Sequence, residues 1–324
     1  APGEEFSLVA TVDDLRGHRA ANRVEHLKVA AGTPSYGIKG ATVPSIAEQP
    51  ATTLTVDFGA PITLTIRATG SGNLTYRWYR DGIEVPGANA ATLSFPQASA
   101  ALSGRYRVLV HGVAGSVLSA ESVVTVTPAT AGRIETLAPL NSQFVAQRRV
   151  DVWLPPGYDA NKDAHYPVLY MHDGQNIFDP VTGYGGVSWE VDRAICRLMK
   201  AGKIPGVIVV GVWNTPARFN EYMFQKAITT PEYQVSPGWP VYSKAAIQGD
   251  AYLKYLVTEL KPLIDRTYRT LPDAAHTGIM GSSMGGLISA YALNEYPDVF
   301  GRAGCVSTHW PLGDGMLIGY FTQH

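Results

Sequence analysis

Ser283 stands in the pentapeptide Gly281-Ser282-Ser283-Met284-Gly285, which has the spacing G-x-S-x-G. The apolar run 276–280 before it predicts a strand, and residues 286–293 after it predict a helix. A strand that turns sharply into a helix needs very small residues at the bend, and it leaves the serine hydroxyl projecting above the sheet edge. The alternative is an ordinary turn, because a chain with 33 glycines produces such five-letter patterns by chance. The flanking elements favour a nucleophile elbow with Ser283 as a catalytic serine.

A serine hydroxyl also needs a base and N–H donors that stabilise the oxyanion. We expect one donor to be the backbone N–H of Met284, the residue after the nucleophile. The second is expected from the loop 172–175, with Gly174 preferred and its neighbour Asp173 as the other candidate. We interpret His172, in the same loop, as a structural and hydrogen-bonded histidine, because the base of such a site normally comes from a later loop.

The catalytic acid and base are not evident in the sequence. In this type of site they follow the serine in the order acid, then histidine, after further strands. The candidates that follow Ser283 are Asp298, His309, Asp314 and His324. We expect the catalytic Asp and His to lie beyond residue 324, so that His309 is a candidate base only if the chain is complete.

Composition and charge argue against several classes of protein. Hydrophobic residues make up 45% and charged residues 16% of the chain, as in a soluble globular protein, and no apolar run is long enough to span a bilayer. The net charge is −1 and no basic stripe is present, which argues against nucleic acid as a partner. Cys196 and Cys305 lack the spacing of a disulfide framework, a zinc site or a redox pair, and are interpreted as small buried residues.

Two sequence patterns divide the 324 residues, a length for which about two domains are expected. From 44 to 127, short runs with period-two alternation, separated by turn residues, predict an all-β sandwich. From 134 to 324, strands alternate with helices, which predicts a mostly parallel sheet covered by helices on both faces. Residues 128–133 are expected to be a linker, and residues 1–43 receive no assignment. Expected strands are 53–56, 62–66, 74–79, 92–95, 106–110, 122–126, 148–154, 167–171, 207–212 and 304–307, and expected helices are 190–201 and 250–268.

The segment 44–127 resembles a bacterial immunoglobulin-like domain. Trp78 takes the position of the core tryptophan, Asp81-Gly82 forms the turn after it, and 103–106 is similar to the tyrosine corner. Ile66 and Val108 stand at the two cysteine positions, so that aliphatic packing replaces the inter-sheet disulfide. The aromatic residues Trp78, Tyr79 and Tyr106 are a candidate sugar platform, but we favour a structural role because two of them are needed in the core.

Several motifs of the second segment occur together and in order. They are Leu154-Pro-Pro-Gly-Tyr158, Tyr170-Met-His-Asp-Gly-Gln-Asn176, Val209-Val-Gly-Val-Trp-Asn214 and His276-Thr-Gly-Ile-Met-Gly-Ser-Ser-Met-Gly-Gly286. Through them the region 148–310 resembles the putative-esterase family, which includes esterase D, enterochelin esterases and feruloyl esterases. The resemblance implies an α/β-hydrolase that cleaves carboxylic esters through an acyl-enzyme on Ser283, without a metal or an organic cofactor.

The substrate is less well defined. Aromatic residues flank the segments expected at the carboxyl edge of the sheet: Trp189, Trp213, Tyr222, Tyr233, Trp239 and Tyr242. We take Trp189, Trp213, Arg218 and Tyr222 as candidate pocket residues, with Arg218 and Glu221 expected to form an ion pair that braces the site. An aromatic wall suits an aryl or hydroxycinnamoyl ester, and the resemblance suggests feruloyl or acetyl esters on plant polysaccharide. The same residues could equally pack down the insertion 230–249.

Three functions remain open on the sequence alone. The first is a serine esterase that acts on a small-molecule or polysaccharide-linked ester. The second is a non-catalytic carbohydrate-binding or adhesion protein with a degenerate hydrolase domain, and the third is an acyltransferase of the same fold, as in the mycolyl transferases. The beginning Ala1-Pro-Gly-Glu4 is compatible with a cleaved signal peptide, so a secreted or periplasmic location is expected. The oligomeric state is left open.

Overall fold

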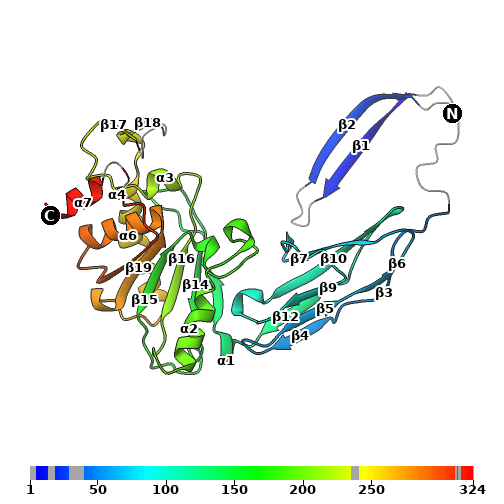
Figure 1. Cartoon of the computed structure of the whole chain (residues 1–324), viewed down its shortest axis with the longest axis horizontal. Coiled ribbons are helices and arrows are strands. Elements are labelled where there is room, and N and C mark those ends of the chain that lie inside the picture. Colours follow the sequence, from blue (N-terminus) through cyan, green and yellow to red (C-terminus); the bar gives the residue numbers. More distant parts are fainter. Residues whose placement is uncertain are drawn as a thin grey trace. The chain divides into compact units, whose positions relative to one another are not determined.

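A computed structural model of the protein describes residues 5–13, 19–28, 40–234, 241–310, 312 and 315–323, and of 5–13, 19–28 and 128–129 it describes the backbone alone. The chain forms two compact units. The first contains Ala1–Ala98 and Leu102–Val126, and the second contains Ser99–Ala101 and Thr127–His324. Figure 1 labels their helices and strands.

The first unit is built of strands, as its period-two alternation predicts. One sheet has the order β4-β12-β10-β7-β8, with β11 paired to β10, and two further strand pairs are β3–β6 and β5–β9. Within the segment that the sequence left unassigned, β1 (Glu5–Asp13) and β2 (Arg19–Lys28) pair in antiparallel fashion. The other strands are β3 (Ser45–Glu48), β4 (Thr53–Val56), β5 (Ile62–Thr65), β6 (Arg67–Thr69), β7 (Thr75–Arg80), β8 (Ile83–Glu84), β9 (Thr92–Phe95), β10 (Gly104–Gly112), β11 (Gly115–Leu118) and β12 (Ser122–Val126).

The core of this unit has the features expected of an immunoglobulin-like domain. Trp78 is fully buried, and its indole N–H donates to the carbonyl of Ala90 at 2.9 Å. The hydroxyl of Tyr106 donates to the carbonyl of Leu102 at 2.8 Å, four residues upstream, which is the tyrosine corner. Ile66 and Val108 are both buried, so aliphatic side chains fill the core where the two cysteines are absent. The structural interpretation of Trp78 and Tyr106 is confirmed.

A six-stranded sheet organises the second unit, in the order β13-β14-β16-β15-β19-β20. The strands β16, β15, β19 and β20 run parallel, whereas β14 is antiparallel to both of its neighbours. All five residues of β14 and of β16 are buried, because both faces of a central strand are covered in such sheets. The strands are β13 (Arg133–Thr136), β14 (Val150–Leu154), β15 (Val168–His172), β16 (Ile208–Val212), β19 (Thr277–Ser282) and β20 (Arg302–Val306), with a separate pair β17 (Glu232–Gln234) and β18 (Val241–Ser243).

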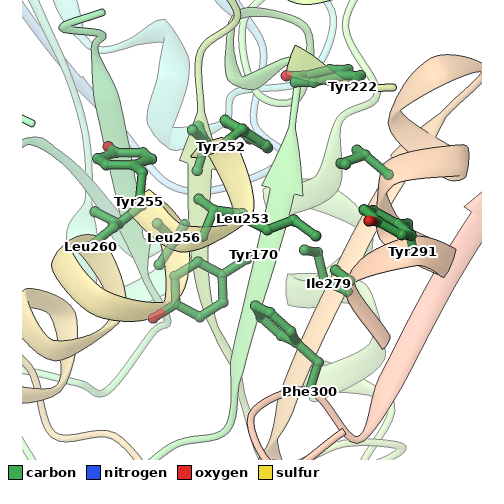
Figure 2. Packing of buried hydrophobic residues seen from close by; sticks show 14 of the residues in the cluster. Tyr170, Tyr222, Tyr252, Leu253, Tyr255, Leu256, Leu260, Ile279, Tyr291 and Phe300 are labelled. Atoms are coloured by element: carbon green, nitrogen blue, oxygen red, sulfur yellow. The ribbon is translucent and has the colours of Figure 1, made fainter. Parts of the chain in front are cut away.

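Helices lie on both sides of this sheet (Figure 1), and the expected fold class, an α/β-hydrolase preceded by an immunoglobulin-like sandwich, is confirmed. The helices are α1 (Pro128–Ala131), α2 (Val191–Lys200), α3 (Arg218–Glu221), α4 (Gly249–Tyr255), α5 (Lys261–Thr267), α6 (Met284–Glu295) and α7 (Met316–Phe321). On one face, buried tyrosines and aliphatic residues from α4, from the turn Leu256–Leu260 after it and from α6 pack on Tyr170 and Ile279 of the sheet (Figure 2). No helix in the described part of the chain is long and apolar enough to cross a membrane.

Two local features add detail to the expectations. The segment 128–133, expected as a linker, contains helix α1, and its last residue, Arg133, begins β13 of the six-stranded sheet. The helix expected over 250–268 is present, as α4, a π-helical turn at Leu256–Leu260 and α5 in direct succession. Propensity and periodicity do not distinguish a wider turn from an α-helical one.

Candidate active site

Ser283 lies at the junction between β19 and α6. Its backbone has φ 54° and ψ −116°, a conformation that side chains other than glycine rarely adopt. The N–H of Ser283 donates to the carbonyl of Val306 at 3.0 Å, and its carbonyl accepts from the N–H of Gly286 at 3.1 Å. The residue is exposed, whereas the nine residues that follow it are buried. The bend is therefore strained, held from both sides, and open to solvent at the serine.

At this bend there is no room for a side chain on Gly281 or Gly286. A Cβ on Gly281 would lie 2.7 Å from the carbonyl carbon of Gly285. A Cβ on Gly286 would lie 2.1 Å from Oγ1 of Thr308, in the segment that follows β20. Both distances are shorter than real Cβ contacts, so the strand can turn into the helix only because these side chains are missing.

Two neighbouring strands, like β19, are followed by a residue with positive φ. Asp173 follows β15 with φ 57° and ψ 48°, and Ser307 follows β20 with φ 43°. Because β15, β19 and β20 are adjacent and parallel, Asp173, Ser283 and Ser307 come to one edge of the sheet. Residues with unfavourable backbone angles cluster at functional sites, since the surrounding structure must hold them there. The sequence analysis missed Ser307, which no motif marks.

The expected oxyanion donors lie at this edge. Met284 is the first residue of α6, so its N–H has no acceptor within the helix. Gly174 begins a 3₁₀ turn (Gly174–Asn176) and is packed so closely that a Cβ on it would lie 2.6 Å from the carbonyl carbon of Gly211 in β16. The N–H of Asp173 donates to the hydroxyl of Tyr222 at 3.2 Å, which leaves Gly174 as the better candidate of the two.

The loop that carries Gly174 packs directly against the first turn of α6. The position of a Cβ on Gly285 is 3.4 Å from Cβ of His172 and 3.5 Å from Oδ2 of Asp173. The candidate donors Met284 and Gly174 therefore belong to two segments that contact each other next to Ser283. This arrangement is suited to two N–H groups that act on one oxygen atom.

Arg218 binds Asp173 rather than Glu221, and the expected ion pair is wrong. Nε and Nη2 of Arg218 donate to the two carboxylate oxygens of Asp173 at 2.7 and 2.8 Å, and Nδ2 of Asn214 donates to Oδ1 at 2.6 Å. Glu221 instead forms a buried pair with Arg148, at 2.6 and 2.9 Å. Both partners come from segments distant in the sequence: Asp173 directly follows β15, and Arg148 precedes β14.

His172 is enclosed in the core. It is 3% exposed, and Nδ1 lies 2.8 Å from the hydroxyl of Tyr252. Burial is the main cause that lowers the pKa of His172 to about 4, and the charges of Arg218 and Arg148 add to this effect while that of Asp173 opposes it. A histidine that resists protonation and is held by a tyrosine fits the structural role expected from the sequence.

The remaining candidates for acid and base differ in position. His309 is half-buried two residues after the strained Ser307, and its Nε2 is buried with no hydrogen-bond partner among the described residues. Oγ1 of its neighbour Thr308 is likewise buried and unpartnered in the described part of the chain. Asp298 is exposed in the turn after α6. Asp314 and His324 lie outside the described residues.

The candidate pocket residues divide into two groups. Trp189 is 38% exposed and Trp213 is half-buried, with its indole N–H donating to Asp151 at 2.7 Å. Tyr222 is fully buried and packs among core tyrosines (Figure 2), so its assignment to an open pocket is wrong. Arg218 keeps 31% of its side chain exposed although its guanidinium is bound to Asp173.

Aromatic residues hold down the insertion between β16 and α4. Tyr233 is buried and stacks on Tyr242 with a centroid distance of 5.7 Å, and Tyr242 stacks on Phe219 at 4.6 Å. For these residues the packing interpretation holds. Trp239 lies outside the described residues. In the described part of the chain, no group of three or more His, Cys, Asp or Glu residues is close enough to hold a metal ion.

Comparison with known proteins agrees with this architecture. The sequence model of the family described as "Putative esterase" matches residues 142–316, more than half of the chain. The chain belongs to the Putative esterase family. The matched region begins before β14 and ends at the start of α7, so it contains the elbow, both candidate donor segments and the Asp173 contacts.

Individual relatives match only parts of the chain. It is 25% identical over 178 residues to "Uncharacterized protein YbbA" of Bacillus subtilis, which covers 53% of the chain and 61% of that protein. It is 26% identical over 182 residues to an "Endo-1,4-beta-xylanase/feruloyl esterase" of Xylanibacter ruminicola, covering 54% of the chain and 22% of that protein. A "Decoration protein" of Escherichia phage T5 is 40% identical over 81 residues, covering 24% of the chain and 49% of that protein. The chain thus spans less than two thirds of each relative.

Among solved structures, an IroE-like serine hydrolase from Shewanella oneidensis is 25% identical to the chain. The superposition covers 52% of this chain and 49% of that one, with a TM-score of 0.41.

Proposed function

We propose that the protein is a carboxylic ester hydrolase that acts through an acyl-enzyme on Ser283. The observation that carries this proposal is the exposed serine at φ 54°, ψ −116°, between a parallel strand and a helix whose first N–H has no acceptor within the helix. Membership of the Putative esterase family supports the same reaction.

The proposed reaction follows from the placement of these groups. Oγ of Ser283 attacks the ester carbonyl carbon while a base takes its proton, and the carbonyl oxygen becomes an oxyanion that accepts hydrogen bonds from Met284 and Gly174. Collapse of this intermediate breaks the bond to the alcohol, which leaves with the proton held by the base. Water then attacks the acyl-serine in the same way and releases the carboxylic acid.

The base has to be a group that can accept a proton near neutral pH and reach the serine. His172 is unsuited, because its pKa of about 4 and its contact with Tyr252 keep it neutral and fixed in the core. Among the described residues we keep His309 as the candidate, since it follows the strand that flanks the elbow and its Nε2 has no partner there. The variant His309→Ala should lose as much activity as Ser283→Ala if His309 is the base, and distinctly less if it is not.

For the substrate we propose an aryl or hydroxycinnamoyl ester, or an acetyl ester, of a plant polysaccharide. The partly exposed Trp189 and Trp213 offer aromatic surface for an acyl group, and one relative carries the name feruloyl esterase. A polysaccharide ester is met outside the cell, so a secreted or periplasmic location belongs to the same proposal. Release of ferulate and of acetate from arabinoxylan, measured side by side, would decide between the two ester types.

The central test uses two neighbouring serines. Ser283→Ala should abolish release of p-nitrophenol from p-nitrophenyl acetate and labelling by a fluorophosphonate, whereas Ser282→Ala, one residue earlier, should retain both. Activity that survives in Ser283→Ala would remove the assignment. A wild-type protein that is never labelled but binds polysaccharide would favour the non-catalytic alternative.

A further inference from the structure

The exit loops of β15 and β16 are joined by a dense set of polar contacts beneath the candidate oxyanion site. Both carboxylate oxygens of Asp173 are occupied by Arg218, and Oδ1 also accepts from Asn214. The N–H of Asp173 is bound by the hydroxyl of Tyr222. Four hydrogen bonds from the segment 214–222, which follows β16, thus act on Asp173, and its carbonyl also accepts from the N–H of Asn176.

Asp173 needs this support because its backbone is strained. Its φ of 57° and ψ of 48° are left-handed, a conformation in which the Cβ of a residue other than glycine is crowded. The next residue is Gly174, whose N–H direction depends on the backbone angles of Asp173. The contacts with 214–222 therefore fix the angles that aim the Gly174 N–H.

A second ion pair anchors the segment that makes these contacts. Glu221, at the end of α3, is fully buried and accepts from both Nη atoms of Arg148 and from Thr215 at 3.1 Å. The guanidinium of Arg148 also lies over the rings of Tyr252 and Tyr255, at 5.2 and 5.4 Å. The arginine that holds Asp173 thus stands on a helix turn that is itself fixed to the core.

The ion pair between Arg218 and Asp173 also affects the proposed reaction, because Asp173 carries a negative charge close to the oxyanion site. Oδ2 of Asp173 lies 3.5 Å from the position of a Cβ on Gly285, in the first turn of α6 next to Met284. An unpaired carboxylate there would repel an oxyanion that forms between Met284 and Gly174. Three other titratable side chains lie around Asp173, and none of them is charged: His172, Tyr222 and Tyr252. The charges of Arg148 and Glu221 are already paired with each other. Arg218 is the positive charge bound directly to Asp173 among the described residues.

We propose that Arg218 is a positioning residue of the oxyanion site: it neutralises Asp173 and holds it in the left-handed conformation that directs the Gly174 N–H toward the oxygen. Arg218 acts through Asp173 and not on the substrate, in contrast to the pocket role expected from the sequence. This inference rests on the proposed esterase function.

The test measures kcat and KM for p-nitrophenyl acetate in the whole protein. Arg218→Met should lower kcat by about 100-fold, the effect of losing one oxyanion donor, with KM changed less than about threefold. Arg218→Lys keeps the charge but not the two parallel hydrogen bonds, and should lower kcat by about 10-fold. The double variant Asp173→Asn/Arg218→Met removes the unpaired charge and should be more active than Arg218→Met alone.

Arg133 provides the matched control, because it forms the same two-pronged contact with Asp159, at 2.8 and 3.1 Å, at the opposite end of the sheet. Arg133→Met should leave kcat within about twofold of wild type. Equal losses in Arg133→Met and Arg218→Met, or an unchanged kcat in Arg218→Met, would overturn the inference.

Two further results, a variant that does not fold and an inactive wild type, are interpreted as follows. If Arg218→Met does not fold, as judged by circular dichroism, Arg218→Lys decides, and an unchanged kcat in that variant rejects the positioning role. If the wild-type protein neither hydrolyses the ester nor reacts with a fluorophosphonate, the proposed function itself fails, and this inference fails with it. An active wild type with an equally active Arg218→Lys and Arg218→Met rejects only the inference.

Discussion

From the burial of His172 we predict how the stability of the second unit depends on pH. Its pKa is lowered to about 4 from the ordinary 6.5, mainly by burial, so the folded protein resists binding a proton that the unfolded chain accepts. Its contribution to stability is fully present above pH 6.5 and is lost as the pH falls toward 4. At about 1.4 kcal/mol for each pKa unit, the loss over this window is roughly 3 kcal/mol.

The variant His172→Gln isolates this effect, because glutamine can still hydrogen-bond the Tyr252 hydroxyl but does not titrate. We expect the free energy of unfolding in urea to fall by roughly 3 kcal/mol more in wild type than in His172→Gln between pH 7 and pH 4. The exposed His165 serves as control, and His165→Gln should follow the wild-type curve. A difference between wild type and His172→Gln that stays constant over this pH range would refute the reasoning.

Two further predictions concern buried charges. Asp192, fully buried in the first turn of α2, has its pKa raised to about 6 by burial, so its contribution to stability is complete below pH 3.8 and is lost as the pH rises through 6. Asp192→Asn should therefore be more stable than wild type by up to about 3 kcal/mol at pH 7 and equal to it near pH 3.5, and a pH-independent difference in urea would contradict this. Glu221→Gln leaves the guanidinium of Arg148 buried without a negative charge beside it and should cost about 3–5 kcal/mol in the same assay. Breaking the exposed Arg67–Glu48 pair by Glu48→Gln should cost less than about 1 kcal/mol, and a comparable loss in the two variants would count against the role of burial.

Sequence patterns were sufficient to predict those strands in which inward-facing and outward-facing residues alternate regularly. The strands 53–56, 92–95 and 122–126 have the bounds expected from alternation, since one face of each points into the sandwich core. The elements around Ser283 followed for a similar reason: an apolar strand and a small-residue helix start are both visible in the order of residues. Strand β13 was missed because three of its four residues are only partly buried and the fourth is exposed, at the edge of the sheet.

The contacts of the candidate site could not be derived in this way. Asp173 and Arg218 are separated by 45 residues, and nothing in the spacing of either motif joins them. Their pairing depends on β15 and β16 being neighbours, which the sheet order decides. Tyr222 was misplaced for a related reason, because aromatic residues near a strand end can face either the core or the solvent. Here the ring of Tyr222 faces the core and packs on the ring of His172, with a centroid distance of 5.1 Å.

The left-handed backbone at Ser307 also bears on attempts to make the protein more heat-resistant. Glycine would relieve the steric cost there, since it lacks the Cβ that causes it. Asp173 differs, because a glycine in its place would also lose the carboxylate contacts with Arg218 and Asn214. A screen that selects only for survival at high temperature is therefore expected to recover the replacement at Ser307 but not the one at Asp173. The Ser307 product would gain tolerance to heat while loosening the strand end next to the nucleophile, so selection for thermal endurance and selection for turnover should diverge at this residue.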